Sequence, residues 1–169
     1  MRKIISVVLA AVMALSMAAC GGETKVETHE LKIARIQGAA HGTKCFTTAT
    51  AVVEGDKVVA AYIDEFQYMA AEDVTGVPNT AEMAANLAEG KALISKRAEN
   101  DYYSAKMAAA GSTVTIAANY DAVQAHVAGK AIADLETEIA GEMAADAVAG
   151  CTLVDAAGYI RVILEAAKA

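Results

Sequence analysis

The chain has no tryptophan, a single proline at Pro78, and aromatic residues at only 5% of its 169 positions. A core built from this composition uses small and medium side chains, and few residues interrupt helices. Alanine-rich segments dominate instead, which favours helix. After one apolar segment at the N-terminus, no second apolar run is long enough to span a bilayer.

Positive charge is also scarce, with 14 Lys and Arg against 21 Asp and Glu and a formal net charge of -7. Loss of Arg2 and Lys3 with a cleaved N-terminal segment would take this charge to -9. An acidic domain binds nucleic acid poorly and is repelled by anionic lipid headgroups. We therefore expect no nucleic-acid partner.

The three cysteines include no Cys-x-x-Cys pair, the dense spacing that zinc sites normally show. The tightest spacing of two soft ligands is His41-x-x-x-Cys45, so the sequence predicts no metal site. A Cys45 or Cys151 nucleophile with His41 or His126 as base is formally possible. The favoured interpretation is a small buried cysteine beside a tight turn.

The first residues, MRKIISVVLAAVMALSMAACGG, combine a basic start, an apolar run over residues 4–15 and small residues directly before Cys20. This pattern resembles the signal peptide and lipobox of bacterial lipoproteins. The resemblance implies a signal peptide over residues 1–19, lipidation of Cys20, and anchoring to the extracytoplasmic face of the cell membrane. Residues 20–30 would be the lipidated cysteine and a flexible tether. The alternatives are an ordinary secretory signal or an N-terminal buried helix.

Residues 31–169 are long enough to form one domain with its own core. An extracytoplasmic location permits a disulfide between Cys45 and Cys151, and the sequence leaves open whether the two residues meet.

The first part of this domain has the pattern of strands. Residues 31–38 alternate apolar and charged side chains, and CFTTATAVVEGDKVVAAYIDEF predicts a hairpin that turns at Gly55. Both faces of the second hairpin strand are largely apolar, which predicts a strand covered on both sides. Asp64 and Glu65 are neighbours on that strand and point to opposite faces, so no carboxylate dyad is expected.

The rest of the domain is mainly helical. The pattern predicts a short helix within residues 70–90, a strand and a helix over 91–111, and helices over 116–128, 132–144 and from Leu153 onward. The charged run at Lys96 and Arg97 is expected to be a solvated helix start. The sequence therefore predicts an α+β fold, with a mainly antiparallel sheet of three to five strands packed against several helices.

Two segments align without gaps at an offset of 39 residues, one from Gly111 to Ala128 and one that starts at Gly150. Each copy delivers a glycine and a threonine, Thr113 or Thr152, to the start of a predicted helix. Unpaired N–H groups and the helix dipole suit an anion there. From spacing alone, the favoured interpretation is that both threonines are N-caps.

The second copy, with its preceding residues DAVAGCTLVD, resembles the FMN-binding domain of extracytoplasmic flavoproteins. This family includes lipoproteins of Gram-positive extracellular electron transfer and a subunit of sodium-pumping quinone reductases. Its signature is Asp, two residues, Ser or Thr, Gly, Ala, then a Thr or Ser that a flavin transferase can esterify to the FMN phosphate. Asp146, Gly150 and Thr152 match it. Ala149 and Cys151 depart from it, which argues against covalent attachment and leaves non-covalent FMN binding at the same cradle.

The resemblance implies a role for each matching residue. Thr152 would meet the phosphate, Gly150 and Cys151 would form the close backbone turn, and Asp146 would shape it. The helix from Leu153 would stabilise the phosphate charge. The flavin ring would lie against the sheet beside one of five aromatic candidates, Tyr62, Phe66, Tyr68, Tyr102 and Tyr103.

The implied protein is a membrane-anchored extracytoplasmic lipoprotein that binds FMN and carries electrons at the cell surface. It would be an electron carrier rather than a substrate-converting enzyme, with a redox partner or a flavin transferase as its partner. The alternative is a non-catalytic surface lipoprotein that binds a small ligand, a peptide or an envelope protein without flavin.

Overall fold

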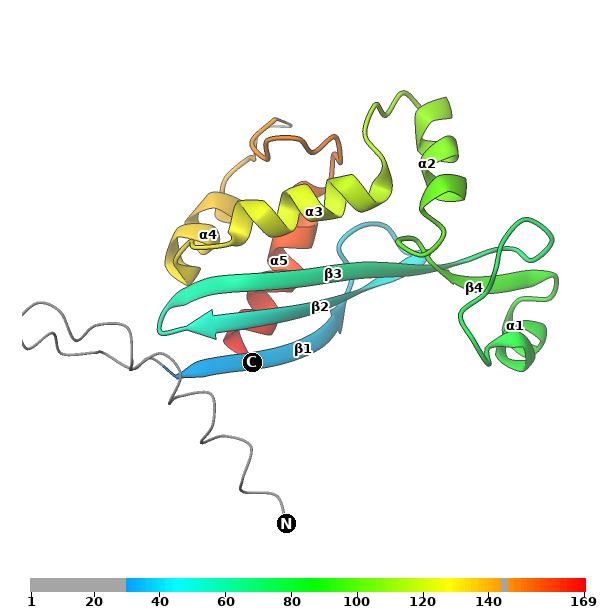
Figure 1. Cartoon of the computed structure of the whole chain (residues 1–169), viewed down its shortest axis with the longest axis horizontal. Helices are drawn as coiled ribbons and strands as arrows, with labels where there is room; N and C mark the ends of the chain where they lie inside the picture. Colours follow the sequence, from blue (N-terminus) through cyan, green and yellow to red (C-terminus); the bar gives the residue numbers. More distant parts are fainter. Residues whose placement is uncertain (1–29, 144–145) are drawn as a thin grey trace, which may run out of the picture.

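The computed structural model describes residues 30–143 and 146–169. Its elements are β1 (Leu31–Gly38), β2 (Cys45–Glu54), β3 (Lys57–Ala70), α1 (Ala81–Leu87), β4 (Lys91–Ser95), α2 (Asn100–Ala109), α3 (Ile116–Val127), α4 (Ile132–Ala140) and α5 (Ala156–Lys168). The strands form one antiparallel sheet in the order β1-β2-β3-β4 (Figure 1). The predicted α+β fold is confirmed, while its likeness to an FMN-binding domain stays a prediction.

The predicted signal peptide and the lipidation site at Cys20 lie outside the described residues. None of the helices in the described part of the chain has the length and apolar character needed to cross a membrane.

The β2–β3 hairpin turns where the sequence predicts it. Glu54 pairs with Lys57, and Gly55 has φ +61°. A positive φ is accessible to glycine without a steric penalty, which explains why the tight turn forms at this residue.

Strand β3 contains one extra residue where its pairing shifts between Val52 and Val53 of β2. Such a bulge shifts the alternation of side chains between the two faces. Val58 and Ile63 are both completely buried although their positions differ by five, an odd offset that would place them on opposite faces of a regular strand, and Tyr62 is 51% exposed. The expectation that both faces of this strand are covered is therefore wrong.

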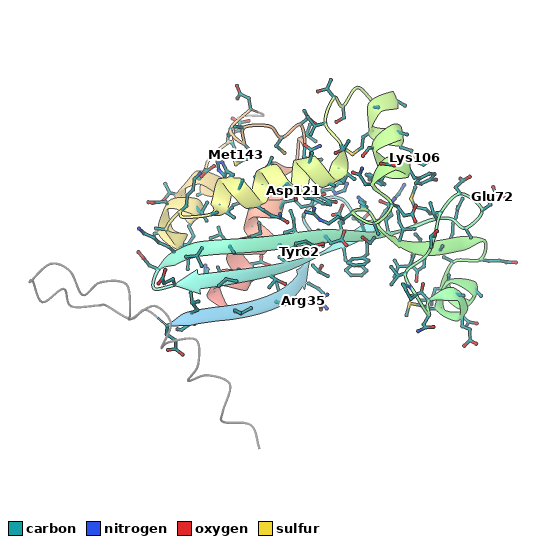
Figure 2. All side chains as sticks on the ribbon, in the orientation of Figure 1. Arg35, Tyr62, Glu72, Lys106, Asp121 and Met143 are labelled. Atoms are coloured by element: carbon teal, nitrogen blue, oxygen red, sulfur yellow. The ribbon has the colours of Figure 1, made fainter. Side chains whose placement is uncertain are left out.

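Helices cover one face of the sheet. Helix α5 packs across β1 and β2, α3 packs along β3, and α4 packs against α5 (Figure 1). No helix of the described residues covers the opposite face, where Figure 2 shows the exposed residues Arg35 and Tyr62. The covered face therefore contains the core, whose largest apolar side chains include Ile63, Ile116, Leu135, Ile160 and Ile163.

Helix α3 begins at Ile116 as predicted, whereas α5 begins later than predicted. The N-cap of α5 is Asp155, so Thr152 lies in the preceding loop and the helix does not begin at Leu153. The N-cap of α3 is Thr115, whose Oγ1 accepts a hydrogen bond from the Ala118 backbone N–H at 3.3 Å. The prediction that Thr113 and Thr152 are N-caps is therefore wrong.

Gly158 allows α5 to pack directly on the loop of residues 39–44, which joins β1 to β2. A Cβ atom at position 158 would overlap the Ala40 carbonyl oxygen. The Ala40 backbone N–H also donates to Thr47 Oγ1 at 3.3 Å, which ties the loop to β2. The loop is thus held between a helix and a strand.

Gly158→Ala is expected to destabilise the domain, although alanine is the better helix former. The overlap with Ala40 should cost about 2 kcal/mol of unfolding free energy, the range of an overpacked core. Gly141→Ala is the control, because nothing lies near its added Cβ and its φ is -89°. Urea unfolding of both variants measures the difference. Equal stabilities would show that the loop and helix are not in close contact.

Candidate functional site

The centre of the domain contains a buried ion pair. Glu65 of β3 and Lys96, which follows β4, are both 0% exposed. Lys96 Nζ donates to Glu65 Oε2 at 2.5 Å, and the Lys96 backbone N–H donates to the Glu65 carbonyl oxygen at 2.8 Å. The expectation of a solvated charge run is therefore wrong at Lys96.

Three hydroxyl groups complete the surroundings of this carboxylate. Thr47 Oγ1 donates to Oε1 at 2.9 Å, and the Tyr159 hydroxyl donates to Oε2 at 2.9 Å. The Tyr120 hydroxyl lies 3.5 Å from Oε2. Tyr120 and Tyr159 occupy equivalent positions in the two aligned segments, and their ring centroids are 5.3 Å apart. Each copy of the repeat therefore delivers a tyrosine to one carboxylate.

Contacts with His41 and Lys96 keep the Glu65 carboxylate ionised. Burial alone would raise its pKa, but the hydrogen bonds from His41 and Lys96 and the charge of Lys96 lower it to about 2. Burial opposes the charge on Lys96 as well, yet Glu65 raises the Lys96 pKa. Burial and the nearby Glu65 charge raise the pKa of Tyr159 well above its usual range. Its hydroxyl therefore stays protonated and serves as a donor.

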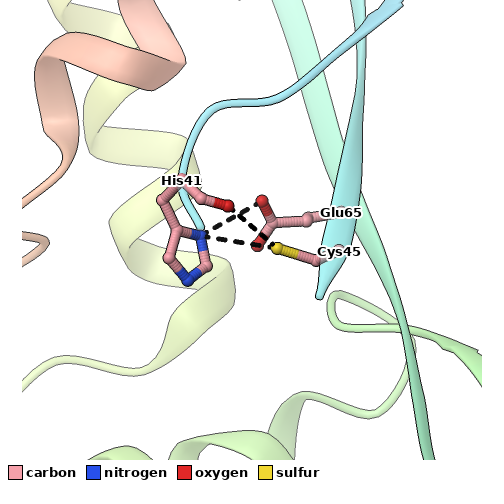
Figure 3. A group of neighbouring side chains, drawn as sticks. All are labelled: His41, Cys45 and Glu65. Carbon is pink, nitrogen blue, oxygen red and sulfur yellow. Dashed lines mark hydrogen bonds and ion pairs between the residues drawn. The ribbon is translucent and has the colours of Figure 1, made fainter. Parts of the chain in front are cut away.

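The loop of residues 39–44 brings His41 and Cys45 to the same carboxylate (Figure 3). His41 Nδ1 lies 3.3 Å from Glu65 Oε1 and 3.7 Å from Cys45 Sγ. The Cys45 thiol also donates to the His41 carbonyl oxygen at 3.1 Å. Burial and the Glu65 charge raise the pKa of Cys45 to about 11, so its sulfur carries a proton at neutral pH.

This trio is not arranged as a nucleophile, base and acid relay. In such a relay the nucleophile and the carboxylate contact different nitrogens of the histidine ring. Here Cys45 Sγ and Glu65 Oε1 both lie next to Nδ1. A protonated thiol is also a weak nucleophile.

Glu65 and its neighbours His41, Lys96 and Tyr159 are called the Glu65 cluster below. A cavity of about 490 Å³ lies against this cluster. Its lining comes from the cluster, from α2 and from the loops before α3 and α5. These residues are His41, Lys96, Tyr103, Met107, Ala110, Gly111, Ser112, Ile116, Thr152, Leu153, Val154, Asp155 and Tyr159. The volume is within the range of small-molecule sites, and most of the side chains are apolar or aromatic.

The structure places Thr152 at this cavity. Its Oγ1 lies 2.9 Å from Ser112 Oγ, and its backbone N–H donates to Asn119 Oδ1 at 2.6 Å. Gly111 and Ser112 line the same cavity from the other aligned segment. The two repeat starts, separated by 39 residues in sequence, therefore meet at one site.

The other predicted cofactor residues, Asp146, Gly150 and Cys151, do not line the cavity. Gly150 has φ +79°, which supports the tight turn expected there. Cys151 is half-buried, and its sulfur accepts from the Leu153 backbone N–H at 3.4 Å. Asp146 is exposed. Gly150, Cys151 and Asp146 are therefore absent from the described residues that line the cavity.

The structure also locates the aromatic candidates and the two cysteines, Cys45 and Cys151. Of the five aromatic candidates, Tyr103 lines the cavity, whereas Phe66 stacks on Phe46 at 5.1 Å. Cys45 and Cys151 are both free thiols within the part of the chain that the structure describes. Tyr120 and Tyr159 are not among the residues that the sequence predicts for the site, although their matched positions in the repeat are a signal that could have identified them.

No protein-family model, no curated protein and no solved structure matches this chain. The fold and site define its class: an α+β domain with helices on one face of an antiparallel sheet, and a mainly apolar cavity beside a buried carboxylate.

Replacing only one partner of the Glu65–Lys96 ion pair should destabilise the domain strongly. Lys96→Met leaves a buried carboxylate without its cation, and Glu65→Gln leaves a buried ammonium group without its anion. Each substitution should lower the free energy of unfolding by about 3 kcal/mol or more. The double variant should cost clearly less than the two single costs together, because no unpaired charge remains. Urea unfolding measures all three variants.

The control is the surface pair of Arg97 and Asp121, 2.8 Å apart, with the Asp121 side chain 63% exposed. Asp121→Asn should cost no more than about 1 kcal/mol. Additive costs for Glu65 and Lys96 would contradict the assignment of a coupled buried pair.

Proposed function

We propose that this protein is a membrane-anchored extracytoplasmic lipoprotein whose domain binds FMN and carries electrons at the cell surface. The observation that supports this most directly is the meeting of two glycine-initiated segments at one cavity, with the Ser112 and Thr152 hydroxyls 2.9 Å apart. Thr152 is the residue that the resemblance to FMN-binding domains assigns to the phosphate.

The cavity suits a flat aromatic ring. Tyr103 of α2 and Tyr159 of α5 line it, together with Met107 and Ile116. Aromatic and thioether side chains pack well against a planar ring system and keep water from it. Flavin between these walls would lie next to the Glu65 cluster, which includes His41 and Lys96 of the cavity lining.

The phosphate would lie at the mouth of the cavity rather than inside it. The lysine that lines the cavity, Lys96, is already paired with Glu65, and the Asp155 carboxylate also lines the wall. A phosphate dianion is therefore better placed near solvent, at the Ser112 and Thr152 hydroxyls. These hydroxyls now donate to the Val114 carbonyl oxygen and to Asn119 Oδ1, and they would turn to the phosphate when it binds. FMN bound there supplies one- or two-electron transfer, and this chain's residues position the ring and limit its exposure to water.

The same charges favour a second candidate function. With Lys96 paired and Asp155 on the wall, a neutral aromatic ligand fits the cavity without any anion-binding contact. The protein would then be a non-catalytic surface lipoprotein that binds a small ligand without flavin.

FMN titration followed by flavin fluorescence tests the site. Ala110→Trp should abolish binding, because Ala110 lines the cavity and the indole would fill it. Ala109→Trp is the matched control, since this exposed neighbour is the preceding residue of α2 and does not belong to the lining. If the two variants bind FMN equally, the flavin site lies elsewhere.

The same titration tests whether the phosphate is recognised. Thr152→Ala should weaken FMN binding by about tenfold through a lost charge-assisted hydrogen bond. Riboflavin, which lacks the phosphate, should not respond to this variant. Thr113→Ala, the equivalent residue in the other repeat, is exposed, lies off the cavity and should leave both ligands unaffected. Equal binding of riboflavin and FMN by all variants would support the neutral-ligand alternative.

Attachment to the membrane depends on Cys20. Expressed in a bacterial host, the chain should incorporate labelled palmitate and lose residues 1–19, which intact mass measures. Cys20→Ser should prevent both changes, while Cys45→Ser should leave both intact. Palmitate incorporation by the Cys20→Ser variant would contradict lipidation at this residue.

A further inference from the structure

We propose that His41, Cys45 and Glu65 form a binding site for a thiophilic divalent cation such as Zn²⁺. The three residues each offer one ligand atom, and these atoms all lie within 4.8 Å of one another (Figure 3). This inference does not depend on flavin binding, and it goes against the sequence-based expectation of no metal site.

The spacing of the donor atoms fits a tetrahedral zinc site. With Zn–N and Zn–O bonds of about 2.1 Å and a Zn–S bond of about 2.3 Å, tetrahedral angles require N···O of about 3.4 Å and N···S of about 3.6 Å. His41 Nδ1 lies 3.3 Å from Glu65 Oε1 and 3.7 Å from Cys45 Sγ. Two edges of the tetrahedron are therefore in place before a cation binds.

The two oxygens of the Glu65 carboxylate have different partners. Lys96 and Tyr159 occupy Oε2, at 2.5 and 2.9 Å. Oε1 accepts a hydrogen bond from Thr47 and contacts His41 Nδ1 at 3.3 Å. The cation would replace the His41 hydrogen bond, so the lone pair that faces His41 becomes a ligand. Lys96 therefore does not have to leave for a metal to bind. Thr47 would act as the outer contact that orients the carboxylate, as metal sites commonly require.

The loop that carries His41 is fixed from two sides. The Ala40 backbone N–H donates to Thr47 Oγ1, and Thr47 in turn donates to Glu65 Oε1. Gly158 lets α5 pack against the Ala40 carbonyl from the other side. A histidine on a loop held in this way is preorganised for a ligand, so less ordering is needed on binding.

Coordination changes the protonation of two groups. His41 Nδ1, which hydrogen-bonds Glu65 Oε1 at 3.3 Å, would bind the cation as the neutral ring with its proton on Nε2. The Cys45 thiol now donates to the His41 carbonyl oxygen at 3.1 Å; on binding, it releases its proton to solvent and the thiolate bonds to the cation. Three protein ligands leave one position for water, as in catalytic zinc sites. Because His41 lines the cavity, that position would be reached from the cavity.

Titration with Co²⁺ tests the site, because four-coordinate cobalt with a thiolate ligand gives a near-ultraviolet charge-transfer band and strong visible bands. The full chain carrying Cys20→Ser is used in detergent, so that Cys45 and Cys151 are its two thiols. One Co²⁺ per chain is expected, with displacement of the spectrum by Zn²⁺. Adding Cys151→Ser should leave the spectrum unchanged, and adding Cys45→Ser should remove the charge-transfer band.

His41→Ala should weaken Co²⁺ binding by more than about tenfold, since loss of even an outer contact to a metal can cost that much. Circular dichroism checks that these variants fold, and FMN titration of the same samples reports the flavin site separately. The proposal is wrong if the parent chain gives no thiolate band, or if the band persists in the Cys45→Ser variant.

Discussion

The fold depends on one buried negative charge. A carboxylate with no access to water is costly unless donors surround it, and the Glu65 carboxylate meets Lys96, Thr47 and Tyr159 at 2.9 Å or less. These donors come from the segment after β4, from β2 and from α5. The sheet, the following loop and the C-terminal helix must therefore assemble together before the charge is satisfied. Such a requirement selects one arrangement among the many that an alanine-rich core would otherwise permit.

Residues that satisfy this charge also form part of the cavity wall. Lys96 and Tyr159 direct their polar ends to Glu65 and contribute to the cavity wall, so the wall is rigid where it is polar. Small side chains such as Ala110 and Gly111 line another part of it and fill little volume. A composition without tryptophan leaves few side chains large enough to close such a space. The cavity is thus bounded by the residues of the ion-pair cluster on one side and by small side chains on another.

Local patterns predicted the elements well and the site poorly. The hairpin at Gly55 and the order of strands and helices follow from alternation, turn chemistry and helical spacing, which are short-range signals. The pairing of Glu65 with Lys96 joins residues 31 positions apart, and no local rule separates a buried lysine from a solvated one. The bulge in β3 changes which face Val58 occupies, and alternation alone cannot locate it. The start of α5 was placed too early because Asp155, rather than Thr152, holds the cap position.

The internal repeat links the two sides of the site. Its matched tyrosines perform the same task, since Tyr120 and Tyr159 both approach Glu65 Oε2. The residues just before them do not: Asn119 binds the Thr152 backbone N–H, whereas Gly158 admits the Ala40 loop. One copy therefore fixes the position of Thr152 and the other fixes that of the loop bearing His41, both of which line the cavity. Exchanging Asn119 and Gly158 would remove both contacts while keeping the composition, so the difference between the copies, rather than their similarity, determines the geometry of the site.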